Sequence, residues 1–547
     1  MSALVLLGIA IIAFVIAYKV YGGFLVKHLD LDDSRKTPAH TMKDGVDYVP
    51  AKAPVLLGHH FASIAGAAPI IGPVTAAVFG WIPAFLWIVL GSIFIGAVHD
   101  FSSIVASIRH KGKSIGIIID HTMGKSGKTL FNIFAWLTLV LIIAVFANIV
   151  ANTFVAVPEA GTASMLFIVI AIIYGFTVYR NNFPVIIGTI VGVALLLLSI
   201  WFGIKFPLVL SFNQWITILM IYVIVASIAP VWILLQPRDY LNSFLLYGMM
   251  AGAIIGLFFY NPTIQLTGFG GFKTNLGYMF PVLFVTIACG AISGFHSLVA
   301  SGTTAKQIDK ETDARIIGYG GMLIEGTLAT VALITAAMLT KGDYAAAIGN
   351  GGPVALFSTG VGSFLEKISI PHSVGTTFTS LVVSAFALTT LDTATRLGRY
   401  IFQEFFERDS ANGSVAKNLG TNPYVATIVT VVASGLLALS NWQAIWPIFG
   451  SANQLLAAVA LLTVSVWLAK IGKNNKFTLY PMIFMFAVTL TALAQLSYKN
   501  LTLADAKLSN YVLGGFGVAL FILAIVLIIF AIKTLKKAHE EHKGFSV

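Results

Sequence analysis

Fifteen runs of about 20 apolar residues follow one another along the chain, and they constrain its fold more than any other feature. A helix of about 20 residues crosses the hydrocarbon core of a bilayer and satisfies all of its own backbone groups. We therefore expect an all-α polytopic membrane protein with about 15 transmembrane helices. The runs lie near residues 3–22, 53–80, 81–106, 129–153, 161–179, 183–203, 214–235, 242–260, 278–305, 316–340, 373–395, 423–440, 443–469, 479–496 and 511–534. The Gly-rich segment 344–366 fits a re-entrant or extracellular half-helix instead.

The composition agrees with a chain that has little soluble mass. Of its 547 residues, 58% are hydrophobic and 10% are charged, and the mean hydropathy is +0.90, whereas about 25% of the residues in soluble domains are charged. The net charge of +11 is spread through short loops, so it does not mark a nucleic-acid-binding domain. The single cysteine, Cys289, excludes an intrachain disulfide framework and a cysteine-cluster metal site.

Positive charge in the loops predicts the orientation, because cytoplasmic loops carry an excess of Lys and Arg. Lys19 is part of the first apolar run. If the N-terminus is outside, most of the other basic residues, of 33 in all, fall on the cytoplasmic side. The outside loops then hold only Lys205, Lys273, Lys341, Lys367, Lys499 and Lys507. We expect a cytoplasmic C-terminus. Residues 1–22 lack the basic n-region and cleavage motif of a signal peptide, so we expect a retained helix.

One apolar run contains residues that disfavour a continuous helix. Residues 58–73 read GHHFASIAGAAPIIGP, and the run 53–80 around them is too long for a simple upright span. Glycine and proline free backbone groups, which a membrane tolerates only where they face protein or a watery cavity. Two interpretations are open. The segment is a kinked helix whose small residues pack against a neighbour, or it is a discontinuous helix that forms a binding site.

A second stretch favours the discontinuous helix. Residues 288–305 read ACGAISGFHSLVASGTTA, again rich in small residues. His60 precedes Gly66 by six residues, and His296 precedes Gly302 by six. In the predicted topology the two runs cross the membrane in opposite directions. Paired broken helices of opposite direction are typical of inverted-repeat transporters, in which they form a site near the bilayer midplane.

The breaks predict the chemistry of that site. A half-helix N-terminus presents unpaired N–H groups and a partial positive charge, which suit a carboxylate. The serine and threonine hydroxyls of these stretches can bind the substrate, or they can instead donate a hydrogen bond to a carbonyl of their own helix. The candidate substrate-binding residues are Ser63, Ala65, Gly66, Ala67, Ser297, Gly302, Thr303 and Thr304.

Ionisable residues inside apolar runs are costly and therefore mark functional sites. The candidates for proton coupling are His60, Asp100, His296, Glu325 and Asp392. Histidine titrates near neutrality, and a neighbouring carboxylate tunes it. Asp392 has an alternative, because it lies near a predicted cytoplasmic helix end where Arg396 or Arg399 can pair with it.

A metal site is the competing interpretation of the same region. His59, His60, His99 and Asp100 lie in the cytoplasmic halves of two consecutive antiparallel spans, so these side chains can meet. Histidine and aspartate are zinc ligands. The chain contains no HExxH or comparable spaced motif. We therefore name these four residues as a candidate zinc site, in which the zinc would be structural. We expect H⁺ as the coupling ion and no other cofactor.

Together these stretches resemble the carbon starvation protein CstA family. The matching segments are GHHFASIAGAAPIIGP, GAVHDF, FVTIACGAISGFHSLVASGTTAKQ, ETDARIIGYGGMLIE, TTLDTATRLGR and WPIFGSANQLLAA, which follow the family order from residue 58 to 464. The resemblance implies an inner-membrane secondary transporter of the amino acid–polyamine–organocation superfamily, with a LeuT-like inverted-repeat core. It also implies import of peptides, or of pyruvate by proton symport, when carbon is scarce. We expect this chain to lack some C-terminal membrane segments of longer family members.

The resemblance implies a division of the chain. We expect a peripheral helix at 1–22, a cytoplasmic loop at 23–52, a first core half at 53–260 and an inverted second half at 261–470. Peripheral helices and a basic tail follow at 471–547. Seven runs separate the start of one broken run from the start of the other, where a plain LeuT-like repeat has five, so extra peripheral helices are inserted.

Our hypothesis is a proton-coupled importer of small carboxylate nutrients, pyruvate or short peptides, and not an enzyme. Its partners are then a small molecule and the lipid bilayer, without nucleic acid. The sequence defines no oligomeric state. A membrane-embedded metalloenzyme is the main alternative. A nutrient sensor or channel is a third, which the lack of an appended signalling domain disfavours.

Overall fold

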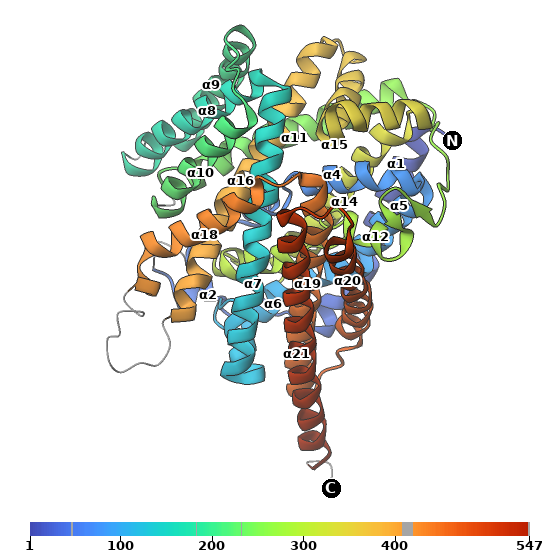
Figure 1. Cartoon of the computed structure of the whole chain (residues 1–547). Helices are drawn as coiled ribbons and strands as arrows, with labels where there is room; N and C mark the ends of the chain where they lie inside the picture. The colour runs from blue at the N-terminus through green and yellow to red at the C-terminus, as the bar shows by residue number, and fades with distance from the viewer. Residues whose placement is uncertain (45–47, 182, 231, 407–418, 545–547) are drawn as a thin grey trace.

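The computed structural model describes residues 1–547 except 45–47, 182, 231, 407–418 and 545–547, and most of it is helical (Figure 1). The first half comprises α1 (Ala3–His28), α2 (Pro38–Thr41), α3 (Ala53–Ile64), α4 (Ala68–Ala76), α5 (Trp81–Gly91), α6 (Ala97–Arg109), α7 (Ile115–Ala156), α8 (Pro158–Tyr174), α9 (Val185–Lys205), α10 (Phe212–Ile228) and α11 (Leu235–Tyr260). The second half comprises α12 (Met279–Thr286), α13 (Gly294–Gly302), α14 (Gly321–Ala337), α15 (Lys341–Glu366), α16 (His372–Phe406), α18 (Pro423–Ala438), α19 (Trp442–Lys470), α20 (Lys476–Thr502) and α21 (Leu508–Gly544). A short hairpin pairs β1 (Lys273–Thr274) antiparallel with β2 (Gly277–Tyr278).

The predicted apolar runs all coincide with helices. Among the described residues, 11 helices are long and apolar enough to cross a membrane, or up to 12 if the bent pair α3–α4 is one span. Two further apolar helices, α10 and α18, have 17 and 16 residues. The run 278–305 is divided between α12 and α13. The multi-pass helical fold is therefore confirmed, whereas the exact number of 15 crossings is not.

Burial separates a core from a lipid-facing periphery. In α19, 89% of the apolar window is buried, compared with 28% in α9 and in α21. The long helix α7 packs against α16, α18, α19 and α21, and it crosses the centre of the molecule (Figure 1). The helices α8, α9 and α10 form a group on one side of α16 (Figure 1). In the sequence these three helices lie between the two broken runs, where the extra helices are expected.

The connections gather at two separate ends of the molecule. At one end, Ser2 forms a bridge with Thr263, and Gly270 N donates to Phe79 O at 2.7 Å. At the other end, Ala51 forms a bridge with Ile308. The 26-residue helix α1 joins the two ends, which places them about 39 Å apart at the helical rise of about 1.5 Å per residue. The segments grouped at each end are those that the predicted topology assigns to one side of the membrane.

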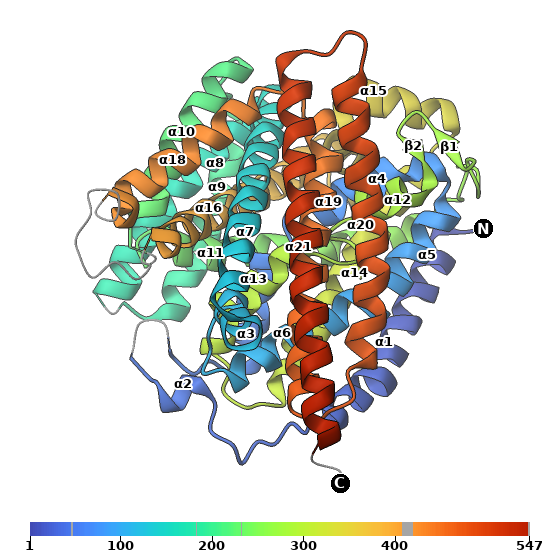
Figure 2. The same ribbon diagram turned by 60° about the horizontal axis from the view of Figure 1, so that its bottom comes forward.

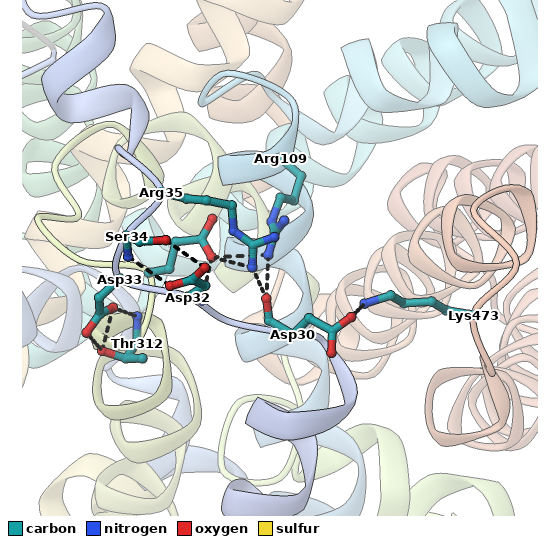
Figure 3. A network of polar contacts seen from close by, with 9 residues as sticks. Asp30, Asp32, Asp33, Ser34, Arg35, Arg109, Thr312 and Lys473 are labelled. Atoms are coloured by element: carbon teal, nitrogen blue, oxygen red, sulfur yellow. Dashed lines mark hydrogen bonds and ion pairs between the residues drawn. The ribbon is translucent and has the colours of Figure 1, made fainter.

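A network of charged side chains ties four of the predicted cytoplasmic segments together (Figure 3). Arg35 and Arg109 approach Glu311 Oε2 at 3.3 and 3.1 Å. Lys473 Nζ lies 2.5 Å from Asp30 Oδ2. These contacts join the segment after α1, the end of α6, the loop after α13 and the α19–α20 connection. Two predicted cytoplasmic basic residues, Arg408 and Lys417, lie outside the described residues.

Candidate functional site

Two broken helices meet at one pocket. The first break lies between Ile64 of α3 and Ala68 of α4, which are bent by 52°. The second break separates α12 from α13 at residues 287–293. The pocket between them, here called the break pocket, is lined by Ile64, Gly66, Ala68, Ile142, Phe146, Cys289, Phe295, Thr390, Phe449 and Asn453. The interpretation of residues 58–73 as a discontinuous helix is therefore confirmed.

Local sequence explains the first break. Ala65 leaves the helical conformation with a ψ of 67°, and Pro69 stands in the first turn of α4, where a missing N–H costs nothing. A Cβ on Gly66 would lie 2.5 Å from Thr390 Oγ1. Only glycine allows α16 to approach the unwound backbone this closely, so Gly66 shapes the wall of the break pocket.

The two half-helix N-termini at the break pocket differ. Phe295 N, in the first turn of α13, donates to Asn453 Oδ1 of α19 at 3.0 Å. The N-terminus of α4 has no side-chain cap, and the first N–H groups of a helix have no partner within it. Pro69 has no N–H, and Ile70 N and Ile71 N donate to Ala67 O, so the N–H of Ala68 and the partial positive charge of the helix end are what this terminus offers an anion. The N-terminus of α4 at Ala68 is therefore the better place for a carboxylate.

A larger pocket lies further along the same helices, toward the end that holds the N-terminus. This entry pocket has about 470 Å³ of empty space, and the break pocket has about 240 Å³. It is lined by Ile71, Ile149, Asn152, Thr153, Ala156, Val157, residues 351–355, Ser380 and Trp442. Helices α4, α7, α16 and α19 line both pockets. One wall is the bend of α15, where Gly352 has a φ of +72°, within the segment predicted to be a re-entrant or extracellular half-helix.

A buried titratable cluster lies beside the break pocket. His296 Nδ1 of α13 donates to Asp100 Oδ2 of α6 at 2.8 Å, and His99 Nδ1 donates to Asp100 Oδ1 at 2.7 Å. None of the three side chains is exposed. The backbone carbonyl of Ile64, at the first break, also faces His296. The cluster therefore touches the backbone that lines the break pocket, and Figure 2 shows α3, α6 and α13 beside one another.

Glu325 of α14 completes this cluster from the opposite side of His296. Glu325 Oε2 lies 3.3 Å from His296 Nε2, but neither Glu325 oxygen has a hydrogen-bond partner among the described residues. The side chain is fully buried. Its open oxygens can take a proton, so His296 stands between two carboxylates.

His60 joins the cluster from α3. Its Nδ1 lies 2.8 Å from Thr304 Oγ1, in the short turn that follows α13, and both side chains are buried. This contact connects the half-helix before the first break with the half-helix after the second. Four of the predicted proton-coupling residues, His60, Asp100, His296 and Glu325, therefore come together on the same side of the break pocket.

Asp392 is not part of this cluster. Its carboxylate pairs with Arg238 of α11 and accepts a hydrogen bond from Tyr222 of α10 at 2.6 Å. The alternative that Asp392 pairs with Arg396 or Arg399 is therefore wrong. The Arg396 guanidinium donates to the Ala226 carbonyl at 2.8 Å. In the described part of the chain, no ion pair joins Asp392 to Arg399. Arg238 reaches Asp392 because α11 packs against α16, and its buried guanidinium needs a counter-ion.

The predicted substrate hydroxyls mostly bond their own helices. Ser63 donates to His59 O at 2.9 Å, Ser297 to Gly294 O at 2.7 Å and Thr303 to Val299 O at 2.9 Å. Residues 302–304 also lie at the far end of α13, away from the second break. The helix does end at Gly302, but the break that lines the pocket comes before His296, at residues 287–293, so residues 302–304 do not line the break pocket. Of the predicted set, Gly66 lines the break pocket, and Ala65 and Ala67 flank it in the break.

The four candidate zinc ligands do not converge. His60 is directed to Thr304, and His99 and Asp100 bond each other. The charged neighbour of His59 is Asp239 of α11. Among the described residues, no three His, Cys, Asp or Glu side chains are placed to hold a metal ion. The structure therefore does not assemble the predicted zinc set.

Several pocket residues carry no charge and escaped prediction as site residues. Phe146, Phe295 and Thr390 line the break pocket, as does Asn453, which also caps α13. Cys289 lies at the second break and accepts a weak hydrogen bond from Asn453 Nδ2 at 3.5 Å. The nearest available signal was the small-residue stretch around Cys289.

The fold and the site define a polytopic helical membrane protein with discontinuous helices. The manganese transporter of Eremococcus coleocola has this fold, with a TM-score of 0.50 at 14% sequence identity over 91% of this chain and 99% of that one. That structure belongs to the LeuT-fold transporters. At this level of identity the likeness shows a shared fold alone.

The chain belongs to the carbon starvation protein CstA family, whose profile matches residues 2–350 and 345–492. The peptide transporter CstA of Campylobacter jejuni is 34% identical over 89% of this chain and 79% of its own length. The pyruvate/proton symporter BtsT of Escherichia coli is 31% identical over 90% of this chain and 81% of its own. Both relatives are named as transporters and neither as an enzyme, which agrees with the expectation of a non-enzyme.

Proposed function

We propose that this protein is a secondary transporter that imports a small carboxylate nutrient, pyruvate or a short peptide, together with protons. The observation that carries the proposal is the shared backbone at Ile64, which lines the break pocket and faces His296 of the buried cluster. Substrate and protons then bind on two sides of one half-helix end. The names of the two relatives, one a peptide transporter and one a pyruvate/proton symporter, support both candidate substrates.

The lining of the break pocket favours pyruvate. The break pocket has about 240 Å³ of empty space, about half that of the entry pocket. Its wall is largely apolar, and the N-terminus of α4 is the place in it that suits an anion. That combination suits a methyl group and a single carboxylate. A dipeptide would need the pocket to widen.

Residues of the buried cluster supply the proton chemistry. His296 lies between Asp100 and Glu325, and His60 lies next to them. A proton on this group compensates buried negative charge, so its arrival and release change the stability of the packing around the breaks. With the N-terminus outside, the substrate moves from the entry pocket to the break pocket and then past the buried cluster to the cytoplasm. This path is the one expected for an inverted-repeat transporter. The family name further suggests a role when carbon is scarce.

Uptake by purified protein in proteoliposomes tests this function. We expect labelled pyruvate to accumulate when the outside is acidic. Without a pH gradient we expect pyruvate exchange but no accumulation. Folded protein that shows neither accumulation nor exchange of pyruvate or of a dipeptide would refute the proposal. A reporter fused to the C-terminus checks the orientation and should be cytoplasmic.

A further inference from the structure

A second group of buried charges lies on another face of α3. Arg238 and Asp239 of α11 and Asp392 of α16 are 2%, 5% and 0% exposed. Arg238 bonds both carboxylates, and its contact with Asp239 Oδ1 is 3.1 Å. Because one guanidinium faces two carboxylates, the group carries one unbalanced negative charge when His59 is neutral. Buried charge without compensation is costly, so the group needs one more positive charge.

Unused polar atoms mark the same place. Asp392 Oδ1 has no hydrogen-bond partner among the described residues, and neither does the side-chain amide of Asn242, which is 1% exposed. Asn242 lies four residues after Arg238, on the same face of α11. The group is therefore not a closed ion pair, because it retains acceptors that are not used.

His59 is the titratable residue that faces this group. Its charge interacts with Asp239, and that of Asp239 with His59. The side chain of His59 is half-buried, whereas that of His60 is fully buried. His59 precedes His60, which belongs to the other cluster, so one turn of α3 contacts both groups.

The second group is also next to the break pocket. Thr389 of α16 is a hydrogen-bond partner of Asp239, and the following residue, Thr390, lines the break pocket. Consecutive residues of α16 thus contact the second group and line the break pocket, just as consecutive residues of α3 contact the two buried groups.

We propose that His59 and Asp239 bind a second proton, separate from that of the His296 cluster, and that this proton moves with the substrate. The inference rests on the proposed function. With the proton bound, the positive charge of His59 balances the group and ties α3 to α11 and α16. Without it, that tie weakens, and the half-helix before the first break is free to move.

Other charged groups near α3 do not replace His59 in this role. Arg315 donates to Tyr18 O, and Tyr319 donates to Ile93 O, so both are directed away from it. Tyr247 of α11 lies next to Gly58, one residue before His59. The groups that interact with His59 or with the second group are His60, Asp239, Arg238, Asp392 and Tyr222.

The test measures how many protons accompany pyruvate. At zero membrane potential and a pH difference of one unit, each coupled proton raises the equilibrium accumulation about tenfold. Two protons therefore give about 100-fold accumulation in the wild type. His59→Gln and Asp239→Asn should each lower it to about tenfold while pyruvate exchange without a gradient persists. Asp239→Asn keeps Arg238 paired with Asp392, so it should fold. His121→Gln, at an exposed position of α7, is the matched control.

The outcomes separate this inference from the proposed function. Wild-type protein that neither accumulates nor exchanges pyruvate or a dipeptide refutes the function itself. If His59→Gln and Asp239→Asn accumulate pyruvate to the wild-type level, the inference is overturned and the proposed function stands. So does a requirement for Na⁺ that Asp239→Asn removes, because the group would then hold a metal cation. If both variants also lose exchange, His59→Lys should restore exchange through its fixed positive charge, and failure of that rescue overturns the inference.

Discussion

His296 Nδ1 donates to Asp100 Oδ2 at 2.8 Å, between residues that are 196 positions apart in the chain and fully buried in the structure. His99 bonds the other oxygen of the same carboxylate. A carboxylate that accepts from two imidazoles fixes both rings and holds negative charge beside the two breaks. This relationship makes the buried cluster a unit rather than a set of separate histidines.

Asp100→Asn should uncouple transport from protons. The amide cannot carry the charge that stabilises a protonated His296, so accumulation driven by a pH gradient should fall at least about tenfold. Uptake of labelled pyruvate into proteoliposomes measures it. Ser103→Ala is the control, because this buried hydroxyl on the same helix has no partner in the described part of the chain. Full gradient-driven accumulation in Asp100→Asn would rule out a coupling role for the cluster.

Gly66→Ala should close the break pocket. The new Cβ would stand 2.5 Å from Thr390 Oγ1, so we expect the affinity for pyruvate to fall more than about tenfold, at a cost of about 1–3 kcal/mol from overpacking. Gly66→Ala/Thr390→Ala should recover part of the affinity, since the remaining Cβ of residue 390 is 3.5 Å away. Gly302→Ala is the matched control, with nothing within 4 Å of its Cβ. Equal effects at both glycines would contradict this placement of the substrate.

Cys289 offers a direct probe of occupancy. It is the only cysteine of the chain and it lines the break pocket. We expect saturating pyruvate to slow its labelling by a small maleimide at least about fivefold, because the ligand covers the thiol. Mass spectrometry of the intact protein follows the reaction, with Cys289→Ser as the unlabelled control. A labelling rate that pyruvate leaves unchanged would place the substrate elsewhere.

Arg238→Gln should destabilise the protein. The substitution leaves Asp239 and Asp392 buried without their shared counter-ion, and breaking a buried pair from one side costs about 3–5 kcal/mol. The midpoint of thermal unfolding in detergent should fall accordingly. Arg238→Gln/Asp392→Asn should regain part of the loss, because one of the two unpaired charges is removed. A double variant no more stable than the single one would argue against charge balance as the cause.

The charged network at the predicted cytoplasmic end should weaken in acid. The hydrogen bond and positive charge of Lys473 hold the pKa of Asp30 below its usual range. A lowered carboxylate pKa stabilises the folded state above the unfolded-state pKa of about 4, and this contribution is lost as the pH falls through the folded-state value. The stability difference between wild type and Asp30→Asn should therefore be present at pH 7 and shrink below about pH 4. Thermal unfolding across this range, with equal salt, measures it. A difference that persists at low pH would exclude the carboxylate as its source.

Much of the fold is predictable because it depends on local composition. The apolar runs coincide with helices, and the Gly and Pro residues of 58–73 coincide with the first break, since both follow from what a segment of about 20 residues does in lipid. His60, Asp100, His296 and Glu325 are identifiable for the same reason, because an ionisable group in an apolar run needs a partner.

The partners themselves depend on packing. Asp392 pairs with Arg238, 154 positions away, although two arginines lie within seven residues of it. Residues 302–304 resemble the first break in sequence, yet they lie where α13 ends, and the break that lines the pocket comes before His296. Thr390, Phe295 and Asn453 look like ordinary core residues until three helices bring them around one pocket.

The sequence by itself determined a polytopic helical membrane chain, one broken helix and the residues that must be neutralised in lipid, because hydropathy and backbone satisfaction act over a single span. Only the tertiary structure decided where the second helix opens, which carboxylate faces which cation, and that His59 and His60 serve different groups. Those choices depend on the rotation and register of packed helices, whose contact energies come from residues far apart in the chain.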